Sequence, residues 1–231
     1  MRQHPDAVMI FAAGFGTRMG ALTRDRPKPL VALGGRTLLD RALDLAAPLA
    51  PARTVVNTHY LGAQIADHLA GRDIAISHEA PDILDTGGGL RQALPLLGDG
   101  PVFTVNPDVL WLGENPLHLA QRHWDNARMD ALLVTVSPEH AYGYSGAGDF
   151  HADADGRLTR GPGQIYGGVQ ILRTEALADY PERVFSLNLV WSRMAQAGRL
   201  FGVSYPGRWC DVGHPAGLEQ AQSLLAGAQD V

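Results

Sequence analysis

Short apolar, β-branched runs alternate with segments of helical spacing along the first 137 residues, and this alternation constrains the fold more than any other feature. The run 7–13 is continuously apolar and stops at Gly14, as expected of a buried strand. The segment 37–47 instead places its leucines and alanines on one helical face. Strands separated by helical crossovers form parallel sheets. The sequence therefore predicts an α/β fold with a doubly wound, mostly parallel, Rossmann-like sheet.

The other predicted elements follow the same alternation. In the first half we expect strands at 54–58, 73–77, 101–106 and 131–137, with helices at 61–70, 89–97 and 116–127. After about residue 138 glycines and turn residues become frequent, and we expect strands at 148–152, 157–159, 165–172 and 200–205, with helices at 187–197 and 215–226. We interpret residues 1–231 as one domain, with a first half, 1–137, and a substrate-facing extension, 138–231.

Composition and charge exclude several classes of protein. The apolar content of 45% and charged content of 19% are those of a globular chain, and the formal net charge of −5 argues against a general nucleic-acid binder. One cysteine, Cys210, permits no intrachain disulfide. The first apolar run is too short for the core of a secretion signal, and no run approaches the length of a membrane helix. We expect a cytoplasmic protein without a membrane partner.

In open α/β sheets, ligands bind beyond the carboxyl ends of the strands, so four predicted loops are candidate site segments: 14–28, 85–89, 106–109 and 208–213. The first contains AAGFGTRMG directly after the first strand, where glycines let backbone N–H groups approach a phosphate. It is not a P-loop, because no Gly-Lys-Ser/Thr follows. A Rossmann oxidoreductase remains an alternative, but its third glycine would fall at Met19.

Lys28 is the only lysine among 19 basic residues. It lies between Pro27 and Pro29, which stiffen the backbone around it. A compact ammonium group that an arginine fork cannot replace is therefore expected here. Beside a glycine loop, such a pre-positioned cation suits a triphosphate.

Three segments together resemble the signature of the sugar-1-phosphate nucleotidyltransferases: GFGTRM, RPKPL and Leu33-Gly34-Gly35. The resemblance implies an Mg²⁺-dependent enzyme that joins a nucleoside triphosphate to a sugar 1-phosphate and releases pyrophosphate. It makes 1–137 the nucleotide-binding half and 138–231 the sugar-binding half, with Lys28 and Arg18 as catalytic residues. The implied nucleotide-binding residues are Ala12, Ala13, Gly14, Gly16, Thr17, Arg18, Thr86, Gly87 and Gly88, the last three in what looks like the family's nucleobase loop.

The resemblance also implies a metal site and a sugar site. Asp108 and the aspartate of Trp-Cys-Asp-Val-Gly, Asp211, would bind Mg²⁺, although Pro107 replaces the glycine that usually precedes the first aspartate. Many relatives carry a Glu-Lys-Pro that holds the sugar phosphate, and this chain lacks it, so an arginine or backbone groups must serve instead. The expected sugar-binding residues are Gly148, Asp149, Gly168, Arg160 and Arg208.

Within the family, several stretches are similar to the short bacterial N-acetylmuramate-1-phosphate uridylyltransferases of cell-wall recycling: 57–62, the triple glycine running into 93–99, 148–150 and 207–209. This similarity implies UTP and N-acetylmuramate 1-phosphate as substrates, with Arg160 as a candidate partner of the lactyl carboxylate. Mannose-1-phosphate guanylyltransferases share the opening motif, so GDP-mannose synthesis stays open. A relative that binds nucleotide without turnover is a further alternative, and the sequence leaves the oligomeric state undetermined.

Overall fold

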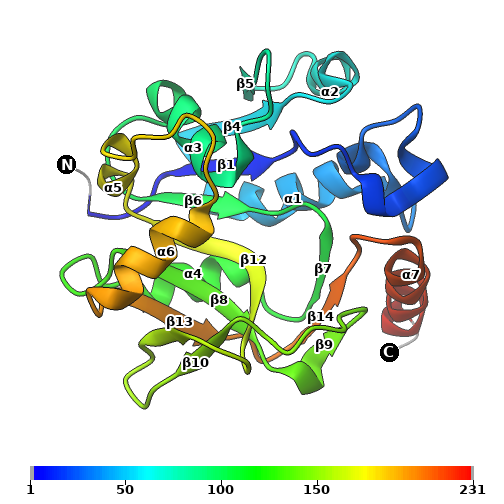
Figure 1. Cartoon of the computed structure of the whole chain (residues 1–231). Helices are drawn as coiled ribbons and strands as arrows, with labels where there is room; N and C mark the ends of the chain where they lie inside the picture. The colour runs from blue at the N-terminus through cyan, green and yellow to red at the C-terminus, as the bar shows by residue number, and fades with distance from the viewer. Residues whose placement is uncertain (1–2, 230–231) are drawn as a thin grey trace.

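The computed structural model describes residues 3–229, and within them the main sheet has seven strands in the order β13-β8-β12-β6-β1-β4-β5 (Figure 1). These strands are β1 (Ala7–Phe11), β4 (Arg53–Thr58), β5 (Ala75–His78), β6 (Val102–Val105), β8 (Ala131–Val136), β12 (Ile165–Leu172) and β13 (Leu200–Ser204). β12 runs antiparallel to β6 and β8, whereas the other neighbouring pairs are parallel. The predicted α/β fold with a mostly parallel sheet is confirmed.

Helices cover both faces of this sheet, as a doubly wound fold requires. They are α1 (Leu38–Ala46), α2 (Gly62–Leu69), α3 (Asp85–Leu97), α4 (Pro116–His123), α5 (Glu175–Ala178), α6 (Leu187–Gln196) and α7 (Pro215–Gln229). Side chains alternate along β1: Val8 and Ile10 pack into the cluster of α1, α2 and α4, while Ala7 and Met9 pack into that of α3, α5 and α6. None of the helices in residues 3–229 is both long enough and apolar enough to cross a bilayer.

A second, three-stranded sheet lies beside the main one and was not predicted. It contains β7 (Val109–Leu112), β14 (Arg208–Asp211) and β9 (Ala141–Tyr142), with β14 in the middle. The segments expected to be loops at 106–109 and 208–213 thus contain strand residues, which pair antiparallel so that Asp211 lies opposite Val109. The remaining short elements are β2 (Ala32–Leu33), β3 (Arg36–Thr37), β10 (Phe150–Ala152), β11 (Leu158–Arg160) and the 3-10 turns η1 (Thr17–Thr23), η2 (Lys28–Leu30), η3 (Ala47–Leu49) and η4 (Pro138–His140).

Helix α3 begins at Asp85, so the prediction of a loop at 85–89 is wrong. Glycine is a poor helix former, which is why the run Gly87-Gly88-Gly89 suggests a loop. Tertiary contacts override that propensity, because the backbone N–H groups of Gly87 and Gly88 donate to the carbonyl oxygen of Phe185 at 2.9 and 3.1 Å. A Cβ on Gly87 would lie 2.4 Å from the Phe185 ring. The glycines therefore allow close packing against the chain before α6.

A polar cluster fixes the start of α1. The hydroxyl of Thr37 accepts the backbone N–H of Asp40 at 3.0 Å, which caps the helix, and donates to the Asp40 carboxylate at 2.7 Å. His68 Nε2 and Arg72 Nη1 lie 3.0 and 2.7 Å from the same carboxylate. Partial burial alone would raise the pKa of Asp40, but the hydrogen bonds from Thr37, Arg72 and His68 outweigh it and lower that pKa to about 2.

Asp40→Asn is expected to lower the free energy of unfolding by about 1–2 kcal/mol at neutral pH. A depressed carboxyl pKa gives stability that is complete above the unfolded-state value of 3.8 and is lost as pH falls toward 2. The deficit of the variant should therefore be present at pH 7 and smaller at pH 3 in urea unfolding. Asp44→Asn, at a half-exposed ion pair with Arg36, is the control. Equal deficits at both pH values would contradict this account.

Candidate active site

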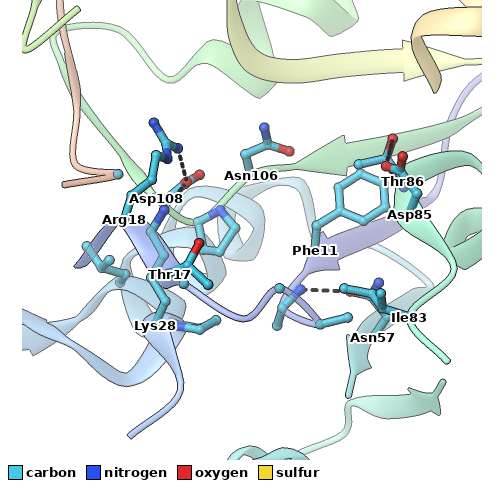
Figure 2. A pocket seen from close by; sticks show the side chains of 18 of the residues that line it. Phe11, Thr17, Arg18, Lys28, Asn57, Ile83, Asp85, Thr86, Asn106 and Asp108 are labelled. Atoms are coloured by element: carbon cyan, nitrogen blue, oxygen red, sulfur yellow. Dashed lines mark hydrogen bonds and ion pairs between the residues drawn. The ribbon is translucent and has the colours of Figure 1, made fainter. Parts of the chain in front are cut away.

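A cavity of about 330 Å³ opens at the carboxyl ends of β1, β4 and β6, as expected for an open α/β sheet (Figure 2). One side carries the charged residues Arg18, Lys28 and Asp108, and the other carries Asp85 and Thr86 at the start of α3. The lining is completed by Phe11, Ala12, Ala13, Gly14, Gly16, Thr17, Pro29, Leu38, Asn57, Glu79, Ile83, Asn106, Pro107 and Gly213. All six residues predicted to bind nucleotide in the loop after β1 thus lie at this cavity.

The turn at Gly16 explains why the loop needs glycine there. Gly16 has φ +66°, and a Cβ on it would lie 2.9 Å from Cβ of Lys28. The carbonyl oxygen of Gly16 accepts the Thr23 hydroxyl at 2.9 Å, which holds the loop against η1. The glycine loop and the lysine loop therefore pack directly on each other.

Lys28 and Arg18 form a charged cluster with two aspartates. The Lys28 side chain is 12% exposed, and its Nζ contacts Oδ2 of Asp108. The Arg18 guanidinium approaches both carboxylates, with nitrogens 4.0 Å from Asp108 Oδ2 and 3.7 Å from Asp211 Oδ2. Arg18 is 62% exposed and its two contacts are long. It is therefore less firmly held than Lys28.

The three-stranded sheet brings Asp108 and Asp211 together. Asp108 immediately precedes β7 and Asp211 ends β14, and the backbone N–H of Val212 donates to the Asp108 carbonyl oxygen at 2.9 Å. The N–H of Gly213 donates to Asp211 Oδ1 at 2.7 Å, which orients that carboxylate. Pro107 is accommodated at the cavity wall without displacing Asp108 from the cluster.

Asp108 and Asp211 are of the chemical type that magnesium takes as ligands. Mg²⁺ takes oxygen ligands and is usually bound by one or two carboxylates together with phosphate oxygens and water. Within residues 3–229 no group of three or more His, Cys, Asp or Glu side chains is placed to hold a metal. A metal here would therefore complete its coordination with substrate oxygens.

Burial and nearby Asp211 raise the pKa of the Cys210 thiol to about 11, so this buried thiol is not a nucleophile.

At the other end of the cavity, only some of the residues predicted to bind nucleotide line the wall. Asp85 adopts φ +59°, and its carboxylate accepts the N–H of Thr86 at 2.6 Å. The Thr86 hydroxyl accepts the N–H of Leu187 at 3.0 Å. Asp85 and Thr86 line the cavity, whereas Gly87 and Gly88 are buried behind them.

The predicted sugar-binding residues do not form one group. The carbonyl oxygen of Gly168, at an irregularity in β12 with φ +96°, accepts the N–H of Asn106 at 2.8 Å, and so positions the first residue of the candidate segment 106–109 at the cavity. Asp149 accepts the N–H of Tyr166 at 2.9 Å. A Cβ on Gly148 would lie 2.3 Å from the carbonyl oxygen of Gly163. Asp149 and Gly148 thus shape the segment before β12.

Neither predicted arginine lines the cavity. Arg160 donates to the carbonyl and side-chain oxygens of Asn188 at 2.8 and 2.9 Å, and lies over the Phe150 ring at 4.6 Å. Arg208 is exposed on β14. Because side chains alternate along a strand, it shares a face with Cys210, opposite the face of Asp211.

Asn57 and Glu79 are buried cavity residues that the sequence analysis missed. Asn57 lies near the end of β4, whose carboxyl end borders the site beside β1. The rule that ligands bind at strand ends could have singled it out. Glu79 follows β5 directly and carries the same signal.

The sequence is similar to known proteins over nearly its whole length. The family model for the MobA-like NTP transferase domain matches residues 8–224. N-acetylmuramate alpha-1-phosphate uridylyltransferase of Caulobacter vibrioides is 39% identical over 99% of this chain and 100% of its own length. The protein of the same name from Neisseria meningitidis serogroup B is 33% identical over 95% of this chain and 98% of its own length.

Solved structures share the fold at lower identity. UDP-glucose pyrophosphorylase complexed with UDP-glucose aligns with a TM-score of 0.79 at 14% identity, over 96% of this chain and 99% of its own. HddC from Yersinia pseudotuberculosis aligns with a TM-score of 0.76 at 22% identity, over 95% and 99% of the two chains. The resemblance of the motifs to sugar-1-phosphate nucleotidyltransferases is confirmed, and the chain belongs to the MobA-like NTP transferase family.

Proposed function

We propose that this protein transfers a uridylyl group from UTP to N-acetylmuramate 1-phosphate, forming UDP-N-acetylmuramate and pyrophosphate. The observation that carries the reaction class is the cluster of Lys28, Arg18 and Asp108 at one end of the cavity, with Asp211 beside it at Arg18. Similarity to two uridylyltransferases over nearly the whole chain supports the choice of substrates. Dependence on Mg²⁺, a cytoplasmic location and a role in peptidoglycan recycling are part of this proposal.

The reaction is an in-line substitution at phosphorus. An oxygen of the sugar phosphate attacks the α-phosphorus of UTP, and the bond from that phosphorus to the β-phosphate bridging oxygen breaks. Both reactants are polyanions, so catalysis depends on positioning and on neutralisation of charge. Magnesium held by Asp108 and Asp211 would supply part of that neutralisation.

The chain's own cations supply the rest. Loop amides from Ala13 to Thr17 would hold the β- and γ-phosphates, with Lys28 directed at the reacting α-phosphate. Arg18 is exposed and only loosely paired with the aspartates, so an incoming triphosphate can draw its guanidinium to the phosphates. Thr86 and Asp85, across the cavity, would face the nucleoside.

Pyrophosphate release over a matrix of substrates tests the proposal. UTP, CTP, GTP, ATP and dTTP are each combined with the 1-phosphates of N-acetylmuramate, N-acetylglucosamine and mannose. We expect the highest kcat/KM for UTP with N-acetylmuramate 1-phosphate, and loss of turnover in excess chelator. A preference for GTP with mannose 1-phosphate would overturn the substrates and leave the reaction class intact. Nucleotide binding without pyrophosphate release for every pair would indicate a non-catalytic relative.

A further inference from the structure

Two buried side chains connect the phosphate loop to the start of α3. Asn57 Oδ1 accepts the backbone N–H of Ala12 at 2.7 Å, and Asn57 Nδ2 donates to Glu79 Oε1 at 2.7 Å. The other carboxylate oxygen, Glu79 Oε2, accepts the backbone N–H of Leu84 at 2.7 Å. Asn57 and Glu79 are 3% and 1% exposed. We call this pair the polar brace.

The brace joins opposite sides of the cavity. Ala12 begins the glycine loop, and Leu84 immediately precedes Asp85 and Thr86 on the facing wall (Figure 2). The backbone of Glu79 is itself held, because its N–H donates to the carbonyl oxygen of Thr58 at 2.8 Å. The brace therefore sets the separation between the wall that would hold phosphates and the wall that would face the nucleoside.

The brace also accounts for the last residue of the triple glycine. A Cβ on Gly89 would lie 2.4 Å from Glu79 Oε1 and 3.0 Å from Asn57 Nδ2. Helix α3 thus passes directly over the brace, and Gly89 leaves the space it occupies. The same carboxylate oxygen that receives the Asn57 amide is enclosed by the helix, so it is not open to a ligand.

Donor and acceptor chemistry restricts which residues can form the brace. Both ends are backbone N–H groups, so each brace side chain must offer an acceptor outward, and the inner contact needs one donor and one acceptor. The native amide and carboxylate, Asn57 and Glu79, satisfy these conditions. The single change Glu79→Gln brings two amide donors together, and the single change Asn57→Asp brings two carboxylate acceptors together. Making both changes at once reverses the inner hydrogen bond and restores every contact.

We infer that Asn57 and Glu79 are positioning residues for the nucleoside triphosphate, an inference that rests on the proposed nucleotidyl transfer. Glu79 is 1% exposed and both of its carboxylate oxygens accept N–H groups of the protein, so we assign it a role through the backbone of Ala12 and Leu84 and not a contact with the base. Loss of the brace frees the loop before the nucleotide arrives, and binding must then restore its order. The brace therefore lowers the KM for nucleotide and leaves kcat and base preference unchanged.

The test is a reciprocal swap, with Asn57→Asp, Glu79→Gln and the double variant compared with wild type. Each single change leaves buried polar groups in conflict, and we expect it to raise the KM for UTP about tenfold or more, with kcat within about threefold. The double variant should return KM to within about threefold of wild type. Gln121→Glu, an exposed amide-to-acid change on α4, is the control.

Three outcomes would overturn the inference: single variants with wild-type KM, a double variant as impaired as the worse single, or a changed ranking of the five triphosphates. If a single variant does not fold, the double must still fold and bind, and its failure to do so also overturns the inference. Binding constants for each triphosphate, measured without sugar phosphate, separate this test from the proposed function. If wild type prefers another triphosphate, the swap is assessed with that nucleotide.

Discussion

Asp108→Asn and Asp211→Asn are each expected to lower kcat/KM for pyrophosphate release by about 10²–10³-fold, because a shared metal contributes several kcal/mol of charge stabilisation. Both carboxylates approach the Arg18 guanidinium, at 4.0 and 3.7 Å from its nitrogens. Asparagine keeps the shape of each side chain but removes the charge that attracts a cation. Binding of Mn²⁺ to the complex of the protein with UTP should weaken in parallel with activity.

The double variant distinguishes a shared ion from two separate effects. Residues that hold one ion act as a unit, so the second substitution should add less than about tenfold to the worse single defect. Asp44→Asn, at a half-exposed ion pair with Arg36, should leave turnover unchanged. Multiplicative losses, or full activity in excess chelator, would rule out the shared metal.

The phosphate side of the site could be predicted because its residues are close in sequence. Gly16 and Lys28 belong to two adjacent loops. These loops pack so closely that a Cβ on Gly16 would lie 2.9 Å from the Cβ of Lys28. The joining of Asp108 and Asp211 could not be derived from spacing. It depends on pairing between β7 and β14, strands separated by nearly a hundred residues, and local sequence predicts a loop at each. Only the family resemblance suggested that the two aspartates act together.

The other errors have a common physical origin, since local sequence does not show what a residue packs against. Three glycines favour a loop by propensity, yet Gly87, Gly88 and Gly89 form a helix because neighbouring chain and the polar brace leave no room for a Cβ. Glu79, beside a proline-containing turn, has the sequence context of a surface residue and is 1% exposed. Arg160, predicted to bind the sugar, lies outside the cavity lining and contacts Asn188 and aromatic rings, which no local pattern shows.

Lys28→Arg is expected to lower kcat by about 10²–10³-fold while the protein stays folded, as for the loss of one charge-stabilising donor. The Lys28 side chain is 12% exposed, and it packs against the turn at Gly16. A Cβ on Gly16 would lie 2.9 Å from the Cβ of Lys28. A guanidinium is larger and planar, so it cannot take the position of the ammonium group. It also binds carboxylates through two parallel hydrogen bonds, and would hold Asp108 more firmly than lysine does.

The substitution therefore impairs the site in two ways that a charge count would miss: the cation is displaced from the reacting phosphate, and Asp108 is withdrawn from the metal. Arg26→Lys, an exposed exchange of the same two residue types on the same loop, should leave kcat unchanged. Pyrophosphate release at saturating substrates gives kcat, and thermal unfolding verifies the fold. Near-normal turnover in a folded Lys28→Arg protein would mean that this position requires only a positive charge, and that the use of lysine instead of arginine here has no catalytic significance.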